Sequence, residues 1–253
     1  PEIIEVRLEG EPKKGVYPKD VILSVLGKIK ADGAVYKAID FTGSYVENLG
    51  VSGRMVICNM AVEMGAKTAY MQPNQAVLDY TDPDFKYEES YVFDVSELEP
   101  QLACPHSVDN VAPLTEVIKD ETITLNQGYI GSCTGGREED IAEAAKILEG
   151  KHIPQYTRLV VVPASAEVMQ TCMEKGYIQS LMAAGATITT PGCGACLGAH
   201  EGILAAGETC ITTTNRNFPG RMGSTEAKIY LASPATVAAS ILNGCITDPR
   251  KYL

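Results

Sequence analysis

The sequence predicts an α/β fold with mainly parallel sheets, and three observations lead to this class. Short runs rich in β-branched residues alternate with amphipathic stretches of helical periodicity, which is the pattern of βαβ units. The chain has 253 residues, 45% hydrophobic and 21% charged, as in ordinary globular proteins. Because domains of about 100 to 150 residues are the commonest, we expect two domains.

We expect residues 1–96 to form the first α/β domain. Its strands are expected at residues 3–8, 35–41 and 68–71, and its helices at residues 18–29 and 53–64. Ser52 is a suitable N-cap for the second helix. Residues 79–90 are polar and carry an Asp-Pro-Asp motif, and an irregular stretch follows up to Pro113. The domain boundary is therefore expected near Glu97.

Residues 97–253 are expected to form the second α/β domain. Its strands are expected at residues 127–131, 158–162, 186–189 and 210–213. Its helices are expected at residues 138–148, 166–175, 178–184, 195–205 and 234–243. The last helix has Ser233 as its N-cap, proline at its first position and Gly244 just after its end.

The net charge and hydropathy of the chain argue against several partners. A formal net charge of −11 disfavours nucleic acid and anionic membranes, which are bound through Lys and Arg. No apolar run reaches the roughly 20 residues that cross a bilayer, and the N-terminus lacks a secretory signal. We therefore expect a cytoplasmic protein with no nucleic-acid or membrane partner. An anionic substrate would need local arginines to oppose this overall charge.

Three of the eight cysteines form a Cys…CxxC set, in which each part follows an expected strand. Cys133 lies in Gly-Ser-Cys-Thr-Gly-Gly at residues 131–136, and Cys193 and Cys196 lie in Pro-Gly-Cys-Gly-Ala-Cys at residues 191–196. Ligand sites in open α/β sheets lie beyond the carboxyl ends of strands, so these segments are expected on one rim. The density of cysteines is low for a secreted disulfide scaffold, and reduced thiols are expected.

Three thiolates on one rim favour a metal centre with an open coordination site. A cubane iron–sulfur cluster usually takes four cysteine ligands, so a cluster held by three has one iron free to act as a Lewis acid. The glycines around the cysteines let the backbone approach such a group closely. A redox-active CxxC, a zinc site and plain strand-to-helix turns remain alternatives, although His106, His152 and His200 lack zinc-type spacing.

Two further groups of residues are candidates for binding an acid. Arg216 and Arg221 lie in the loop after the strand expected at residues 210–213, and guanidinium groups bind carboxylates through paired N–H groups. A basic surface loop is the alternative. Asn59 and Glu63 are four residues apart and share a helix face, with a solvated surface glutamate as the alternative. The remaining five cysteines are expected to be small core hydrophobes.

Together, five motifs resemble the aconitase superfamily, most closely the large subunits of the isopropylmalate dehydratase and archaeal homoaconitase type. The match runs across nearly the whole chain. The motifs are Cys-Asn-Met-Ala-Val-Glu at residues 58–63, Pro-His-Ser-Val-Asp-Asn at 105–110, Gly-Ser-Cys-Thr at 131–134, Gly-Cys-Gly-Ala-Cys-Leu-Gly-Ala-His at 192–200, and Asn-Arg-Asn-Phe-Pro-Gly-Arg-Met-Gly at 215–223.

The resemblance implies a role for each candidate residue. Cys133, Cys193 and Cys196 would ligate a [4Fe–4S] cluster whose fourth, labile iron binds the substrate hydroxyl and a carboxylate. Glu63 would act on the iron-bound water or hydroxyl, and Arg216 and Arg221 would bind substrate carboxylate or steady the cluster side of the pocket. The resemblance also places four polar residues around the cluster and its ligands, namely Asn59, Asn215, Ser132 and Thr134.

The sequence departs from the family pattern in a few places. Gly135 stands where relatives usually have Asn, and Ala195 where they usually have Pro, which puts hydrogen bonding and loop rigidity near the cluster in doubt. The sequence begins at Pro1 without a methionine, and we expect that upstream residues are missing from it, among them the family's amino-terminal domain with its Asp-Ser-His-Thr segment. The resemblance places the catalytic serine base on a separate small subunit. We therefore expect that this chain alone does not complete the reaction.

The resemblance implies two three-layer α/β/α domains with mainly parallel sheets, the second and third domains of an aconitase. It implies the large-subunit part of a hydro-lyase that isomerises 2-isopropylmalate to 3-isopropylmalate by dehydration and rehydration, in leucine biosynthesis. Homoaconitase or another alkylmalate or dimethylmalate dehydratase is the first alternative. An iron- or redox-sensing module is the alternative from another class. The implied partners are an alkylmalate substrate and a small subunit with a swivelling domain.

Overall fold

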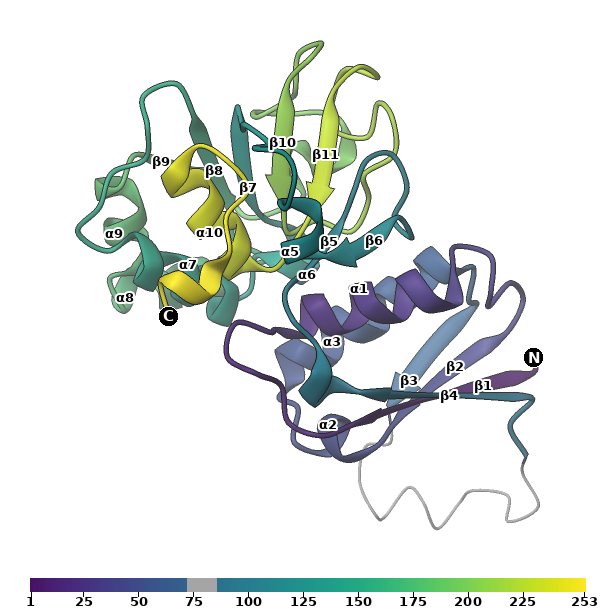
Figure 1. Ribbon diagram of the computed structural model, residues 1–253. Helices are drawn as coiled ribbons and strands as arrows, with labels where there is room; N and C mark the ends of the chain where they lie inside the picture. The colour runs from purple at the N-terminus through teal and green to yellow at the C-terminus, as the bar shows by residue number, and fades with distance from the viewer. Residues whose placement is uncertain (72–85) are drawn as a thin grey trace.

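The structure contains two β-sheets, and most strands in both run parallel (Figure 1). The computed structural model describes residues 1–71 and 86–253. The first sheet has the order β3 (Thr68–Met71), β2 (Ala38–Thr42), β1 (Ile3–Glu9) and β4 (Glu89–Asp94). The second has the order β6 (Val111–Pro113), β5 (Gln101–Ala103), β11 (Lys228–Leu231), β10 (Thr209–Thr212), β7 (Gln127–Gly131), β8 (Arg158–Val162) and β9 (Ala186–Ile188). The predicted α/β class with mainly parallel sheets is confirmed.

The first sheet is built around β1, which pairs in parallel with both β2 and β4. Its residues Ile4, Val6 and Leu8 are fully buried, and burying an aliphatic side chain of this size contributes about 1.5–3 kcal/mol. Helices α1 (Pro18–Ile29) and α3 (Val51–Asn59) lie on the face that is turned toward the second sheet (Figure 1). The shorter elements here are α2 (Ser44–Glu47), η1 (Met60–Met64) and η2 (Val95–Glu97).

The second sheet is covered differently on its two faces. Ile130, Leu159 and Ile211 pack in a cluster with α7 (Glu138–Leu148), α9 (Tyr177–Ala183) and α10 (Pro234–Asn243). Tyr129 and Val160 point the other way, into a cluster that also contains the buried residues of β1. One hydrophobic core therefore continues from the first sheet onto one face of the second. The division into residues 1–96 and 97–253 stays a prediction.

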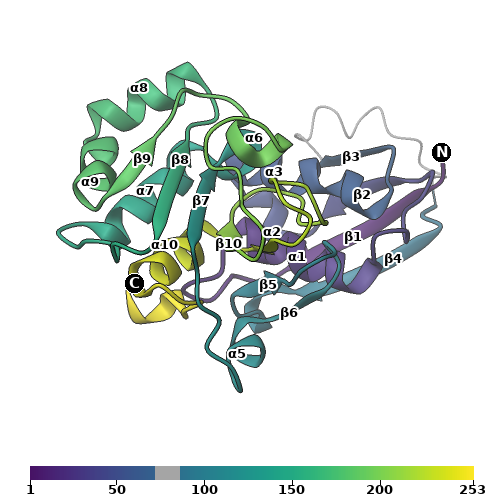
Figure 2. The same cartoon turned by 90° about the horizontal axis from the view of Figure 1, so that it is seen from above.

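The remaining elements are short, and one of them lies at the meeting point of the two sheets. They are α5 (Leu114–Val117), α6 (Ser132–Gly135), α8 (Ala166–Glu174), η3 (Gly194–Leu197) and η4 (Pro249–Lys251). Seen from above, α6 lies next to α3, although the two helices belong to different sheets (Figure 2). No helix in the described part of the chain is long and apolar enough to span a membrane.

Several elements are confirmed at the residues predicted from the sequence. They are β3, β7, β8, α1, α7 and α10. The boundaries of α8, α9, β1, β9 and β10 differ from the predicted ones by one residue. Ser233 occupies the N-cap position of α10, but its hydroxyl makes no capping bond and instead lies 2.9 Å from the Thr236 hydroxyl.

Two predicted elements of the first sheet begin or end at other residues. The strand expected at residues 35–41 begins only at Ala38, because Tyr36 has a left-handed φ of +67° and closes a turn. The helix expected at residues 53–64 begins at Val51 and continues from Met60 as a 3₁₀-helix. Its N-cap is Gly50, so the assignment of Ser52 as N-cap is wrong.

The helix predicted at residues 195–205 is wrong. Only the 3₁₀-helix η3 forms there, and it ends at Gly198, whose φ is +85°. His200 and Gly202 follow with φ values of +78° and +87°. An α-helix needs φ near −60° at every residue, so three left-handed residues within five positions exclude it.

The stretch expected to be irregular contains three strands. β4, β5 and β6 all lie between residues 86 and 113, and β11 was also not predicted. β5 and β6 have three residues each, which is too short for a recognisable period. Of the polar segment predicted at residues 79–90, residues 79–85 lie outside the described residues.

Asp20 generates a testable prediction, because its fully buried carboxylate joins α1 to the second sheet. One oxygen accepts from the Tyr17 backbone N–H (2.9 Å) and the other from the Gln101 backbone N–H (2.8 Å). Asp20→Asn would turn an NH₂ group toward one of these donors, and we expect it to lower the unfolding free energy by about 1–3 kcal/mol in urea at pH 8. Asp32→Asn, at an exposed turn, is the control. Equal unfolding midpoints for Asp20→Asn and the unaltered chain would contradict this.

Candidate active site

The candidate site lies at the carboxyl ends of three parallel strands of the second sheet. Cys133 is in α6 directly after β7, Cys193 and Cys196 follow β9, and Asn215 and Arg216 follow β10. β7 pairs in parallel with β8 and β10, and β8 with β9, so these strands end at the same edge. The structure therefore brings the three segments to one rim, which is also where α6 meets α3 (Figure 2).

The cysteine thiols on this rim are free. All eight cysteines lie within the described residues and none forms a disulfide. Cys133 and Cys193 are exposed and Cys196 is half-buried. Tyr129, buried in β7, donates its hydroxyl to the carbonyl oxygen of Cys193 (2.7 Å) and so fixes the CxxC turn to the sheet. Burial raises the pKa of this hydroxyl, and negative charge on Cys196 and Cys193 raises it further, so both thiols lie within electrostatic reach of Tyr129.

A hydrogen-bonded network of four side chains adjoins Cys133. The Asn215 amide donates to Asn59 Oδ1 (2.6 Å), while its own Oδ1 accepts from the Thr134 hydroxyl (2.7 Å) and from Lys19 Nζ (3.1 Å). Asn215 lies in the segment after β10, and the other three side chains come from α3 (Asn59), α6 (Thr134) and α1 (Lys19). The network therefore ties both sheets to the rim.

Glu63 and Arg216 form an ion pair beside this network. Arg216 Nε donates to Glu63 Oε1 at 2.7 Å. The Glu63 side chain is only 9% exposed, so its carboxylate has lost most of its contact with water. The ion pair with the Arg216 guanidinium group offsets most of this loss. The two residues come from η1 and from the loop after β10, more than 150 positions apart.

Arg221 lies in the loop that follows Arg216. Its Nε is buried and has no hydrogen-bond partner among the described residues, and its guanidinium lies 5.9 Å from the Phe218 ring centre. A Cβ added at Gly198 would lie 3.2 Å from the Arg221 carbonyl oxygen, so the end of the CxxC turn packs directly on this loop. A buried guanidinium N–H without a partner is poised to donate to a bound anion.

Ser132 and Thr134 flank Cys133 and are both buried. Ser132 has a left-handed φ of +68°, which is strained for a residue with a side chain and turns the backbone sharply at the end of β7. Thr134 belongs to the asparagine network described above. Both residues adjoin the rim thiol, and their place around a cluster stays a prediction.

A cavity of about 610 Å³ opens between α3, β3 and the Cys133 turn. Asn59, Cys133 and Thr134 line it, together with the cations Lys67 and Arg137. Arg137 Nη1 lies 3.5 Å from the Cys133 carbonyl oxygen, and its buried Nε has no partner among the described residues. The sequence analysis missed Arg137, although its spacing of four residues from Cys133 was a usable signal.

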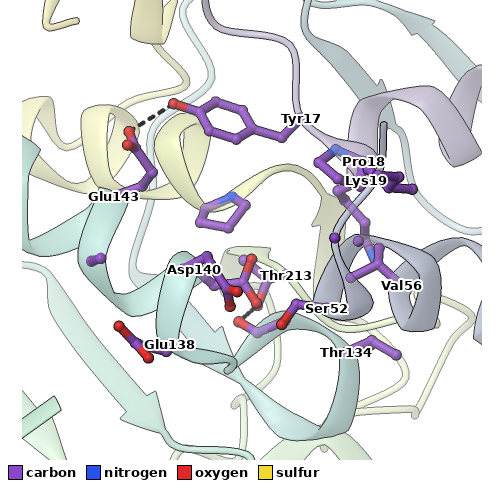
Figure 3. A pocket seen from close by; sticks show the side chains of 17 residues that line it. Tyr17, Pro18, Lys19, Ser52, Val56, Thr134, Glu138, Asp140, Glu143 and Thr213 are labelled. Carbon is purple, nitrogen blue, oxygen red and sulfur yellow. Dashed lines mark hydrogen bonds between the residues drawn. The ribbon is translucent and has the colours of Figure 1, made fainter. Parts of the chain in front are cut away.

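A second cavity, of about 460 Å³, lies on the other side of Thr134 (Figure 3). Lys19 enters it from α1, Asp140 lines it from α7, and Tyr17 donates its hydroxyl to Glu143 (2.8 Å) at one end (Figure 3). Burial lowers the pKa of Lys19 to about 8 and raises that of Asp140 to about 7. The sequence analysis also missed Lys19, since a lysine in the first turn of a helix is usually solvated.

The described residues contain no group of three His, Cys, Asp or Glu side chains placed to bind a single metal ion. An iron–sulfur cluster makes a different demand, because each cysteine binds a separate iron and the thiols need not converge on one point.

The comparisons with known proteins support the resemblance drawn from the sequence. A sequence model described as "Aconitase family (aconitate hydratase)" matches residues 1–82 and 80–244. This chain belongs to the aconitase family. The family resemblance stated from the five motifs is thereby confirmed.

Three curated relatives show which branch of the aconitase family is most similar. The 3-isopropylmalate dehydratase large subunit 1 of Methanopyrus kandleri is 51% identical over 100% of this chain and 63% of its own length. The probable methanogen homoaconitase large subunit of Methanothermobacter thermautotrophicus is 47% identical over 99% of this chain and 61% of its own. The 3-isopropylmalate dehydratase large subunit 1 of Thermotoga maritima is 45% identical over 100% and 64%.

The chain spans less than two thirds of the length of each of these three relatives. Among solved structures, Thermococcus kodakaraensis aconitase X in its holo-form aligns with a TM-score of 0.49 and 14% identity, over 89% of this chain and 53% of that one.

Asp140 predicts a specific dependence of stability on pH. Burial raises the pKa of its carboxyl from 3.8 to about 7, so between these pH values the folded chain holds a proton that the unfolded chain has released. Its contribution therefore makes the unfolding free energy fall as pH rises from about 4 to 7. Asp140→Asn keeps an acceptor for the Arg137 backbone N–H but cannot titrate.

We expect Asp140→Asn to make the fall in unfolding free energy between pH 5 and pH 7 smaller by about 1–2 kcal/mol. Urea titrations of both proteins at each pH measure this difference. Glu139→Gln, the exposed neighbour on α7, is the control and should leave the pH dependence nearly unchanged. An identical pH dependence in Asp140→Asn and the unaltered chain would contradict the assignment.

Proposed function

We propose that this chain is part of the large subunit of an iron–sulfur hydro-lyase that isomerises 2-isopropylmalate to 3-isopropylmalate, a step of leucine biosynthesis. The observation that carries the proposal is that three cysteines with free thiols follow strands ending at one sheet edge, and the Glu63–Arg216 ion pair and the asparagine network involve residues that follow a third strand at that edge. The relatives named 3-isopropylmalate dehydratase large subunit, at 45% and 51% identity, support the choice of reaction.

Cys133, Cys193 and Cys196 are the proposed ligands of a [4Fe–4S] cluster with one labile iron. Free thiols in exposed or half-exposed turns suit such a group. The left-handed φ values of Gly194 and Gly198 (+51° and +85°) produce a tight turn, in which the backbone approaches without a Cβ in the way. When bound, the cluster supplies a Lewis acid that polarises a hydroxyl group.

The protein groups around this centre bind and orient the acid. Arg221, with its unpartnered Nε, and the outer N–H groups of Arg216 would bind carboxylates through paired hydrogen bonds. Glu63 would hold or release a proton next to the hydroxyl, and Arg216 fixes the orientation of its carboxylate. Asn59 and Asn215 would donate hydrogen bonds around the cluster and its ligands.

The proposed partner is a small subunit that carries the swivelling domain and the serine base. The large-subunit names of the relatives agree with a second subunit. We propose a cytoplasmic enzyme that acts on a small alkylmalate, with no nucleic-acid or membrane partner. The net charge of −11 supports the absence of both polyanions.

Homoaconitase is the second candidate, and one comparison favours it specifically. Two methanogen proteins named probable homoaconitase large subunit are 47% identical to this chain. Both reactions move a hydroxyl between adjacent carbons of a 2-substituted malate, so the same rim residues serve either. An iron- or redox-sensing role for the same cysteines stays the hypothesis from another class.

Reconstitution with iron and sulfide tests the cluster. After anaerobic reconstitution we expect about four irons and four sulfides per chain with broad visible absorbance, and a large loss of both in Cys193→Ser. Cys172→Ser, in the buried core, is the matched control and should keep the wild-type content. A colourless chain that retains zinc instead of iron and sulfide would contradict the hydro-lyase proposal.

Glu63→Gln tests the proposed acid–base role in the assembled large and small subunits. The variant keeps the acceptor for Arg216 Nε but loses the exchangeable proton, so we expect kcat to fall by about 10²–10⁴ with little change in KM. Assays with 2-isopropylmalate and with homocitrate separate the two candidate substrates. Glu47→Gln, on the exposed face of α2, is the control. An unchanged kcat in Glu63→Gln would remove this residue from the mechanism.

A further inference from the structure

Lys19 is the most deeply buried cation near the proposed active site, and all three of its N–H groups have acceptors. The residue is 4% exposed and lies in the first turn of α1. Its Nζ donates to the Thr214 carbonyl (2.8 Å), to Asn215 Oδ1 (3.1 Å) and to the Met60 sulfur (3.2 Å). An ammonium group has three donors and no acceptor, so this coordination is complete.

The ion pairs between described residues do not include Lys19. Its charge is instead opposed at longer range by Asp140, Cys196, Glu63 and Cys133, each of which favours the protonated amine. Burying an ammonium group without a direct carboxylate partner is costly, and lost stability is the usual result. Because Lys19 is buried at this cost next to the proposed catalytic side chains, we expect it to have a function there.

The explanation lies in the amide group of Asn215. An amide can rotate by half a turn and exchange its oxygen and its NH₂ group. The Thr134 hydroxyl tolerates either arrangement, since a hydroxyl both donates and accepts. Lys19 does not, because the reversed amide would turn its NH₂ group against an ammonium that has no acceptor. The lysine therefore decides which way Asn215 faces.

The same constraint passes on to Asn59. With its oxygen held by Lys19, Asn215 directs its NH₂ group to Asn59 Oδ1, at 2.6 Å. Since that oxygen is occupied, Asn59 has its own NH₂ group left as a donor, in the cavity that Cys133 lines. One ammonium group thus fixes the orientation of both amides and leaves the Asn59 NH₂ group as a donor in this cavity.

We infer that Lys19 is a positioning residue of the proposed active site, whose buried ammonium orients Asn215 so that its NH₂ group binds Asn59 and leaves the Asn59 NH₂ group as a donor in the cavity that Cys133 lines. Only the effect of Lys19 on catalysis rests on the proposed function. The amide orientation itself is a property of the chain without its cofactor. Lys19 touches neither the thiols nor any reacting atom, so it acts through the asparagines.

The test uses Lys19→Met, which keeps the length of the side chain and removes the ammonium group. Lys28→Met is the matched control, because Lys28 lies on the exposed face of the same helix. In the iron-free chain labelled with nitrogen-15, the Asn215 side-chain NH₂ signals are assigned through their loss in Asn215→Asp. We expect Lys19→Met to shift these signals and to speed their exchange with water by about tenfold, while Lys28→Met leaves both unchanged.

The catalytic consequence is measured in the assembled enzyme. We expect Lys19→Met to lower kcat by about tenfold to a hundredfold with KM within about twofold, because mispositioned donors weaken the transition state more than substrate binding. Lys19→Gln, which keeps a donor toward Asn215 but no charge, should recover part of this loss. It also serves as the second variant should Lys19→Met not fold.

A folded Lys19→Met or Lys19→Gln chain whose Asn215 signals match the wild type would overturn the inference. Failure of the proposed function is a separate outcome. If neither the wild type nor the variant takes up iron and sulfide, the hydro-lyase proposal fails, while a shift of the Asn215 signals in Lys19→Met still supports the positioning role.

Discussion

The cysteine and arginine segments of the candidate site depend on the parallel pairing of β7 with β8 and β10. The registers Gly131↔Val162 and Thr212↔Tyr129 fix where these strands end, and β9 joins the same edge through β8. A parallel sheet sends each strand's following segment out at the same edge, so residues 60 to 80 positions apart meet without a long search for contacts. An antiparallel arrangement would separate Cys133 from Cys193 by the length of a strand. Sheet topology therefore places these segments next to one another before any side-chain contact is considered.

The first turn of α1 then joins this rim to the other sheet. Two adjacent buried residues do so with opposite charges: Lys19 binds the segment after β10, and Asp20 binds the start of β5. Both charges are costly to bury, and burial lowers the pKa of Lys19 and raises the pKa of Asp20. Glu63 and Asn59 reach the rim from the same side because α1 and α3 pack together beneath it. The proposed site is thus shared between the sheets, and neither sheet contains it alone.

The fold and the placing of the candidate cysteines at one sheet edge were predictable from the sequence where the physical signal is local. Amphipathic periodicity located α1, α7 and α10, and β-branched runs located β7 and β8. To predict that the Cys…CxxC set lies on one rim, it was enough to know that parallel strands end at the same edge of a sheet. By contrast, the helix expected at residues 195–205 failed because its apolar residues suggest a helix while Gly198, His200 and Gly202 all take positive φ values. Short strands such as β5 and β6 exist through pairing with β11, which no local pattern reveals.

Buried polar residues and their partners were also not predictable from the sequence. In the sequence, Lys19 stands in a helical turn typical of a solvated lysine, and only the packing of two sheets shows it to be enclosed. Arg216 was expected to bind substrate, and the structure shows its Nε committed to Glu63. Such long-range partnerships, over more than 150 positions, carry no signature in sequence spacing.

The proposed chemistry requires that three thiols on one rim hold a cluster with one iron open to an acid. Mössbauer spectroscopy of the chain reconstituted with iron-57 tests it most directly. We expect one of the four iron sites to differ from the other three, and only that site to change when a 2-hydroxy dicarboxylic acid is added together with the small subunit. Four equivalent irons that ignore the acid, or a single mononuclear iron, would contradict the account.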